Sequence, residues 1–170
     1  LSPADQQLAA TLAQVRALVI PAVGPKLEPA LFENRTIQLV QVTGAGVDRL
    51  DEPAMRKFGI AVANVPGSST DAVAEYAVSC ALMLLRRIAW ADGEIRLGNY
   101  GEIRARMIAD SLCGLSGLVV GVVGFGTIGT AVAEAFHRMG GRIVYHDPVA
   151  ANSAAAQRMA AQPLSLHELL

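Results

Sequence analysis

The sequence has few cysteines, little net charge and no long apolar run, and each shortage narrows the range of possible functions. The only cysteines among the 170 residues are Cys80 and Cys113. Two cysteines make neither a disulfide framework nor a zinc site. We therefore expect no metal centre, and a reducing, cytoplasmic compartment is the simplest setting for the protein.

The charge balance argues against nucleic acid and membrane surfaces as partners. Fourteen Lys and Arg residues oppose fifteen Asp and Glu residues, so the net charge is -1. This balance does not predict the broad basic surface that either partner needs. The longest apolar stretch, residues 73–85, is interrupted by Glu75, Tyr76 and Ser79 and is too short to cross a bilayer. We expect no secretory signal, because no basic segment leads into an apolar run.

Strands alternate with helices along most of the chain. We expect strands at residues 17–20, 37–42 and 60–64, and helices at residues 8–17, 26–32 and 52–58. This alternation is typical of parallel βαβ units and predicts an α/β fold. A long apolar helix follows at residues 71–87, and the more polar residues 89–115 have the composition of an interdomain connection or arm. We place a domain boundary near residue 88, which gives domains at residues 1–88 and 89–170.

A glycine-rich turn opens the second βαβ pattern. Gly124, Gly126 and Gly129 form G-x-G-x-x-G directly after a β-branched strand and directly before a helix. The first glycine permits a tight turn, the second lets a pyrophosphate approach the backbone, and the third lets helix and strand pack closely. Backbone N–H groups near Thr127 and Ile128 then face the phosphates. The pattern predicts dinucleotide binding, although a glycine-rich turn that binds nothing is the alternative.

An acidic residue stands where a ribose-binding carboxylate is expected. Asp147 directly follows the strand at residues 142–146 and lies 18 residues after Gly129. A carboxylate there accepts hydrogen bonds from the ribose hydroxyls and repels a 2′-phosphate. Pro148 and Val149 follow, with no adjacent arginine to neutralise such a phosphate. The sequence therefore favours NAD over NADP as the cofactor.

Five separated motifs occur in an order and spacing that resemble one known family. They lie at residues 43–48, 59–60, 64–67, 73–75 and 118–129. The sequence resembles the D-isomer-specific 2-hydroxyacid dehydrogenases, which include phosphoglycerate, D-lactate, glycerate and formate dehydrogenases. The resemblance implies an incomplete flavodoxin-like substrate domain followed by an incomplete Rossmann NAD-binding domain. It also implies a homodimer formed through the cofactor domain and an arm at about residues 86–106.

The resemblance assigns site residues as well. Gly44, Ala45 and Gly46 match the family loop whose backbone N–H groups meet the substrate carboxylate. The cofactor-binding positions of the family match the glycine-rich turn with Thr127 and Ile128, and Asp147. The implied activity is hydride transfer between the nicotinamide of NAD and a D-2-hydroxy acid or its 2-keto acid. Val42 occupies a position where some phosphoglycerate-type relatives carry arginine, which argues against a phosphorylated substrate.

The catalytic histidine, its acidic partner and the arginine of the family have no match in the sequence. His137, His146 and His167 all stand in other places. We therefore assign no catalytic residue and expect a fragment that is inactive by itself. The main alternative is a non-enzymatic NAD(H)-sensing interaction module of the same family, and a degenerate gene remnant is a further one. The particular 2-hydroxy acid, or formate, stays open.

Overall fold

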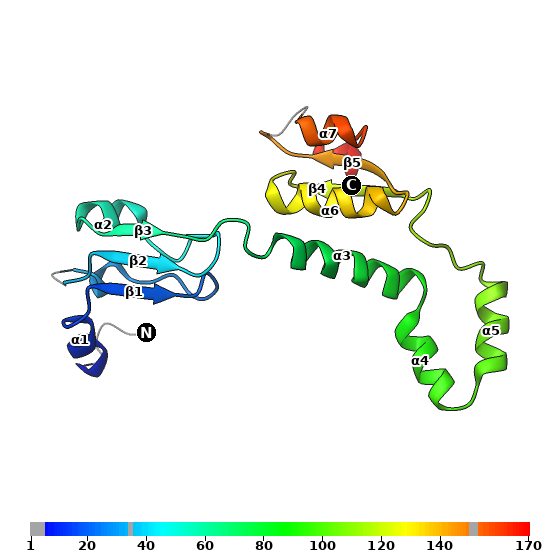
Figure 1. The fold of residues 1–170 in the computed structure, drawn as a ribbon, viewed down its shortest axis with the longest axis horizontal. Helices are drawn as coiled ribbons and strands as arrows, with labels where there is room; N and C mark the ends of the chain where they lie inside the picture. The colour runs from blue at the N-terminus through cyan, green and yellow to red at the C-terminus, as the bar shows by residue number, and fades with distance from the viewer. Residues whose placement is uncertain (1–5, 34–35, 150–152) are drawn as a thin grey trace. The chain divides into compact units, whose positions relative to one another are not determined.

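The computed structural model describes residues 6–33, 36–149 and 153–170. Its internal contacts divide the chain into two compact units, one ending at Ser69 and the other beginning at Thr70. Figure 1 colours the first unit from blue to cyan and the second from green to red. Each unit contains one three-stranded parallel sheet, so the expected α/β fold with two parallel sheets is confirmed.

The sheet of the first unit has the order β1-β2-β3, and all of its strands are parallel. The strands are β1 (Ala17–Ile20), β2 (Leu39–Val42) and β3 (Ala61–Ala63). The central strand β2 buries Val40 and Val42 completely, and Met55 of helix α2 (Glu52–Lys57) is equally buried in the same core. Apolar side chains from the strands, the helices and the loops between them thus give this unit a core of its own.

Local sequence signals explain the bounds of α2. The Asp51 carboxylate accepts a hydrogen bond from the Ala54 N–H at 2.9 Å, which satisfies one of the free donors at the start of the helix. Gly59 follows the helix with φ of +69°, a left-handed conformation that glycine adopts without strain. The helix therefore begins and ends where capping chemistry predicts.

Two helices expected in the first unit are shorter than predicted. Helix α1 covers Gln6–Leu12 instead of residues 8–17. The helix expected at residues 26–32 is only the 3-10 turn η1 (Pro29–Leu31). Pro29 lacks an N–H and disfavours the helical conformation in the residue before it, and Glu28 is indeed extended with ψ of 132°. The proline overrides the apolar pattern of this segment.

The sheet of the second unit has the order β4-β5-β6, and its strands are also parallel. The strands are β4 (Val119–Val123), β5 (Arg142–His146) and β6 (Gln162–Pro163). Helix α6 (Thr127–Arg138) connects the first two strands. Its buried residues Ala133 and Phe136 pack with Ile143 of β5 in the second core.

The last part of the chain differs from the sequence-based expectation. The alanine-rich composition of residues 150–161 predicts a helix there. The structure has the shorter helix α7 (Ala154–Arg158), and residues 150–152 lie outside the described residues. Strand β6, which was not predicted, precedes helix α8 (Leu166–Leu169) and pairs Gln162 with Val144. A strand of two residues is too short to show an alternating pattern. Hydrogen bonds from Ser165 at the start of α8 lower the pKa of Glu168 below its usual value.

Helix α3 (Thr70–Leu85) groups with the second unit. The sequence assigned it to the first domain, with a boundary near residue 88. Its side chains Ala77, Val78 and Ala81 pack against the second core, beside α6. A helix that is apolar nearly all round is typically buried on all sides, but Tyr76 and Leu84 are 72% and 79% exposed. Packing along one face therefore suffices to hold this apolar helix.

Helices α4 (Ile88–Arg96) and α5 (Tyr100–Ala109) form a hairpin where the sequence predicted an arm (Figure 1). Arg87, just before α4, has a left-handed backbone with φ of 48°, and its guanidinium pairs with Asp110 at the end of α5. The Arg106 guanidinium lies 5.0 Å from the centroid of the Trp90 ring. These contacts join the two helices. Among the described residues, no helix has the length and apolar character that a membrane crossing requires.

Candidate functional site

The glycine-rich turn joins β4 to α6 in a conformation that depends on its glycines. Gly124 has φ of +87°, where other residues are strained. A Cβ atom on Gly129 would lie 1.9 Å from the Gly124 carbonyl oxygen, so only glycine lets the first turn of α6 approach β4 so closely. The geometry therefore agrees with the roles expected from the sequence, a tight turn at Gly124 and close packing of helix and strand at Gly129.

The outer side of the turn is open. A Cβ atom on Gly126 would meet no atom within 4 Å. Gly126 precedes the first residue of α6 and has no side chain with which to cap the helix. The first N–H groups of α6, at Thr127 and Ile128, therefore have no intrahelical acceptor. Both residues are exposed, so the turn presents backbone donors to solvent, and its residues fit a pyrophosphate.

Asp147 lies against this turn. Its Oδ2 atom accepts a hydrogen bond from the Phe125 N–H at 2.6 Å, and its Oδ1 atom accepts one from the Val149 N–H at 2.8 Å. Parallel pairing of β4 with β5 explains the contact, because the carboxyl ends of both strands lie at the same edge of the sheet. The structure thus brings together the turn and the acid that the sequence singled out separately.

The three histidines have no assigned role at this turn. His146 ends β5, and its Nδ1 atom lies 3.0 Å from the Leu164 carbonyl oxygen. His137 and His167 are exposed on α6 and α8. Within the described ranges, no group of His, Cys, Asp and Glu side chains has the arrangement of a metal site.

The turn after β2 holds the three predicted substrate-binding residues. The Asn64 side-chain amide donates to the Ala45 carbonyl oxygen at 2.7 Å, and the Val65 N–H donates to the Gly44 carbonyl oxygen at 3.0 Å. Both carbonyl groups are thereby tied to the segment after β3, while Ala45 and Gly46 remain exposed. The sequence included Asn64 in the motif at residues 64–67 but gave it no role, and its hydrogen bond to Ala45 was not predicted.

A packing test is available at Gly44. A Cβ atom there would lie 2.7 Å from the Cβ atom of Ala22. Gly44→Ala is therefore expected to lower the free energy of unfolding by about 1–3 kcal/mol through overpacking. The double variant Gly44→Ala with Ala22→Gly should recover most of this loss, as measured by urea unfolding. Ala22→Gly alone is the control, and a double variant no more stable than Gly44→Ala would contradict the packing argument.

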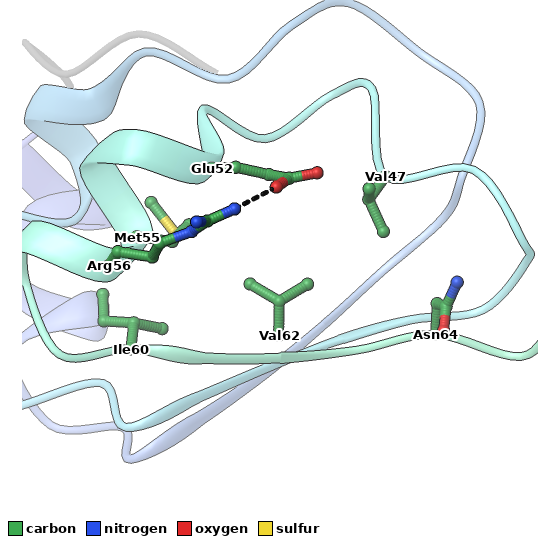
Figure 2. A pocket seen from close by; sticks show the side chains of 7 residues that line it. All are labelled: Val47, Glu52, Met55, Arg56, Ile60, Val62 and Asn64. Atoms are coloured by element: carbon green, nitrogen blue, oxygen red, sulfur yellow. Dashed lines mark hydrogen bonds and ion pairs between the residues drawn. The ribbon is translucent and has the colours of Figure 1, made fainter.

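A pocket of about 340 Å³ lies beside this turn, between α2 and β3. Figure 2 shows it lined by Val47, Met55, Ile60, Val62 and Asn64, with Glu52 and Arg56. The two charged side chains pair with each other at 2.8 Å. Because this pair neutralises itself, the pocket offers no unpaired cation for a substrate carboxylate. The turn at residues 44–46, in which Ala45 and Gly46 are exposed, stays the better candidate for that role.

Comparison with known proteins agrees with these features. Residues 2–165 match the family described as D-isomer specific 2-hydroxyacid dehydrogenase, catalytic domain. The chain is 35% identical over 136 residues to a glyoxylate reductase of Thermococcus litoralis, covering 78% of this chain and 41% of that protein. It is 32% identical over 112 residues to a D-2-hydroxyacid dehydrogenase (NAD+) of Lacticaseibacillus paracasei, covering 66% of this chain and 32% of that protein.

A solved structure has the same fold. The D-lactate dehydrogenase of Aquifex aeolicus, complexed with NAD and lactic acid, superposes with a TM-score of 0.81 at 23% identity, over 95% of this chain and 47% of that one. The chain thus spans about half the length of this solved relative and less than half of the two sequence relatives. With the family match extending over nearly all of its residues, the chain belongs to the D-isomer-specific 2-hydroxyacid dehydrogenase family.

Proposed function

We propose that the protein is an NAD-dependent oxidoreductase that transfers a hydride between the nicotinamide and a D-2-hydroxy acid or its 2-keto acid. One observation carries the proposal. The donors of the glycine-rich turn and the Asp147 carboxylate meet at one edge of a parallel sheet, joined by the hydrogen bond from the Phe125 N–H. Dinucleotides bind at this edge in Rossmann folds.

In this proposal, the pyrophosphate binds the open side of Gly126 and the N–H groups of Thr127 and Ile128. Gly124 and Gly129 shape the turn, and Asp147 binds the adenosine ribose. The nicotinamide, when bound, supplies the hydride acceptor or donor. The negative charge of Asp147 favours NAD, because a 2′-phosphate beside it is repelled. The relative named D-2-hydroxyacid dehydrogenase (NAD+) supports the same cofactor.

The proposed substrate is a small 2-hydroxy or 2-keto acid. The backbone at Gly44, Ala45 and Gly46 binds its carboxylate, and the Asn64 amide holds the turn in place. A relative that is a glyoxylate reductase supports this substrate class. We assign neither the base that takes the hydroxyl proton nor the cation that faces the carboxylate to any of these 170 residues.

The proposal includes a cytoplasmic homodimer. Cys80 and Cys113 are both free, as a reducing compartment favours. The α4–α5 hairpin exposes large apolar side chains that an interface with a second copy would bury: Ile95, Leu97, Tyr100 and Ile108. The loss of such apolar exposure is a common feature of homodimer interfaces.

The test has two arms. On the natural gene product, NADH and NADPH binding is measured by calorimetry, and NADH-dependent reduction of glyoxylate, pyruvate and hydroxypyruvate is measured by the loss of NADH. We expect NADH to bind more tightly than NADPH and at least one keto acid to be reduced. Binding without turnover would favour the non-enzymatic alternative. The absence of NADH binding would overturn the proposal.

A further inference from the structure

Phe125, the residue between the first two glycines of the turn, contacts β5 and its end in two ways. Its ring stacks on the Tyr145 ring, with centroids 4.1 Å apart and an interplanar angle of 27°. Its backbone N–H donates a hydrogen bond to the side chain of Asp147, which lies two residues after Tyr145. The Phe125 and Tyr145 side chains are 2% and 1% exposed, so the stack lies inside the second core. One residue of the turn is therefore fixed through both its side chain and its backbone.

These contacts also orient the Asp147 carboxylate. The Phe125 N–H holds one of its oxygen atoms, and the Val149 N–H holds the other. Two donors on opposite oxygen atoms fix the plane of a carboxylate. A displacement of Phe125 would move one of these donors and the glycines on either side of it. The positions of the turn and of the carboxylate are therefore linked through Phe125.

We propose that Phe125 is a positioning residue that couples the pyrophosphate-binding turn to the ribose-binding carboxylate. The proposal rests on the proposed dinucleotide binding and assigns a role to a residue that the motif itself leaves unspecified. With the ring stacked on Tyr145, the Phe125 N–H stays directed at Asp147, and both parts of the site are formed before the cofactor arrives. Such preorganisation lowers the cost of binding.

The proposal predicts that Phe125 acts through Asp147. Phe125→Leu keeps an apolar side chain but removes the ring stack, and we expect it to weaken NADH binding about tenfold. Asp147→Asn weakens binding by itself. If Phe125 works by placing the carboxylate as well as the turn, the variant carrying both changes should lose clearly less NADH affinity than the product of the two single losses, because coupled residues are not additive.

The matched control is Phe136→Leu in α6. Phe136 lies in the same core and is 7% exposed, but it stands in the last turn of α6, at the other end of the helix from the glycine-rich turn. Phe136→Leu also removes a buried ring, so it should lower the free energy of unfolding about as much as Phe125→Leu does. We expect it to change NADH affinity less than about threefold, and any such change to multiply with that of Asp147→Asn.

Calorimetric titration with NADH, beside a thermal unfolding curve for each variant, gives all of these values. Unchanged affinity in a folded Phe125→Leu variant would overturn the proposal, as would losses that multiply with Asp147→Asn. If Phe125→Leu does not fold, the milder Phe125→Met enters the same cycle with the same expectations. All variants are made in the natural gene product, and failure of its unmodified form to bind NADH would instead overturn the proposed function, and this inference with it.

Discussion

Gly129→Ala is expected to abolish NADH binding and to destabilise the second unit. The added methyl group would lie 1.9 Å from the Gly124 carbonyl oxygen and 2.9 Å from its carbonyl carbon. Backbone atoms cannot rotate away as a flexible side chain does, so α6 must move from β4. We expect the free energy of unfolding to fall by about 3 kcal/mol and NADH affinity to fall at least a hundredfold, since the turn loses its shape.

Gly126→Ala separates the two effects of this experiment. Its methyl group would meet no protein atom within 4 Å, so the variant should unfold at the same temperature as the unmodified chain. The methyl group would nevertheless occupy the side of the turn that the pyrophosphate approaches, so NADH affinity should fall about tenfold or more. Gly93→Ala in α4, which is equally open, controls for the added methyl group. If Gly126→Ala binds NADH with unchanged affinity, the proposal that the pyrophosphate binds at this turn is wrong.

Asp147→Asn is expected to change the preference between cofactors. The amide keeps the shape of the carboxylate and an oxygen that accepts the Phe125 N–H, but it removes the negative charge. Repulsion between a carboxylate and a 2′-phosphate about 5 Å away costs on the order of 1–3 kcal/mol at intermediate dielectric. The ratio of NADPH affinity to NADH affinity should therefore rise about tenfold to a hundredfold.

The control for this charge change is Asp92→Asn. Asp92 is an exposed carboxylate of α4 that pairs with Arg96 at 2.8 Å. Its neutralisation changes the net charge of the chain by the same amount, and the cofactor ratio should stay within about twofold because surface charges at a distance are screened. Calorimetry with NADH and NADPH measures both variants. An equal rise of the ratio in both variants would show that net charge, rather than the position of Asp147, sets the preference.

The sequence predicted the elements that carry strong local signals. The strand around Val122 has four β-branched valines among its five residues, and α2 has both an acidic cap and a glycine just after its end. The segment around Pro29 shows the opposite case, because an apolar helical spacing was overridden by one proline. Strand β6 has only two residues, and its pairing depends on β5, so no local pattern announced it.

At the candidate site, the sequence supplied positions but not contacts. The spacing of Gly124, Gly126 and Gly129 is sufficient to predict a turn, and Asp147 follows from its distance along the chain. The hydrogen bond from Phe125 to Asp147 spans 22 residues, and that from Asn64 to Ala45 spans 19. Both arise because parallel pairing places the ends of successive strands side by side. Such contacts require the register of the sheets, which a single sequence does not contain.

The position of Trp90 makes the α4–α5 hairpin separately observable. Trp90 is the only tryptophan of the chain, and it lies in the hairpin beneath the Arg106 guanidinium. Selectively excited indole emission therefore reports on the hairpin and on neither sheet, whereas far-ultraviolet circular dichroism averages over both units. A fluorescence transition that precedes the dichroism transition in urea would identify the hairpin as an independently melting segment, without any added dye or label.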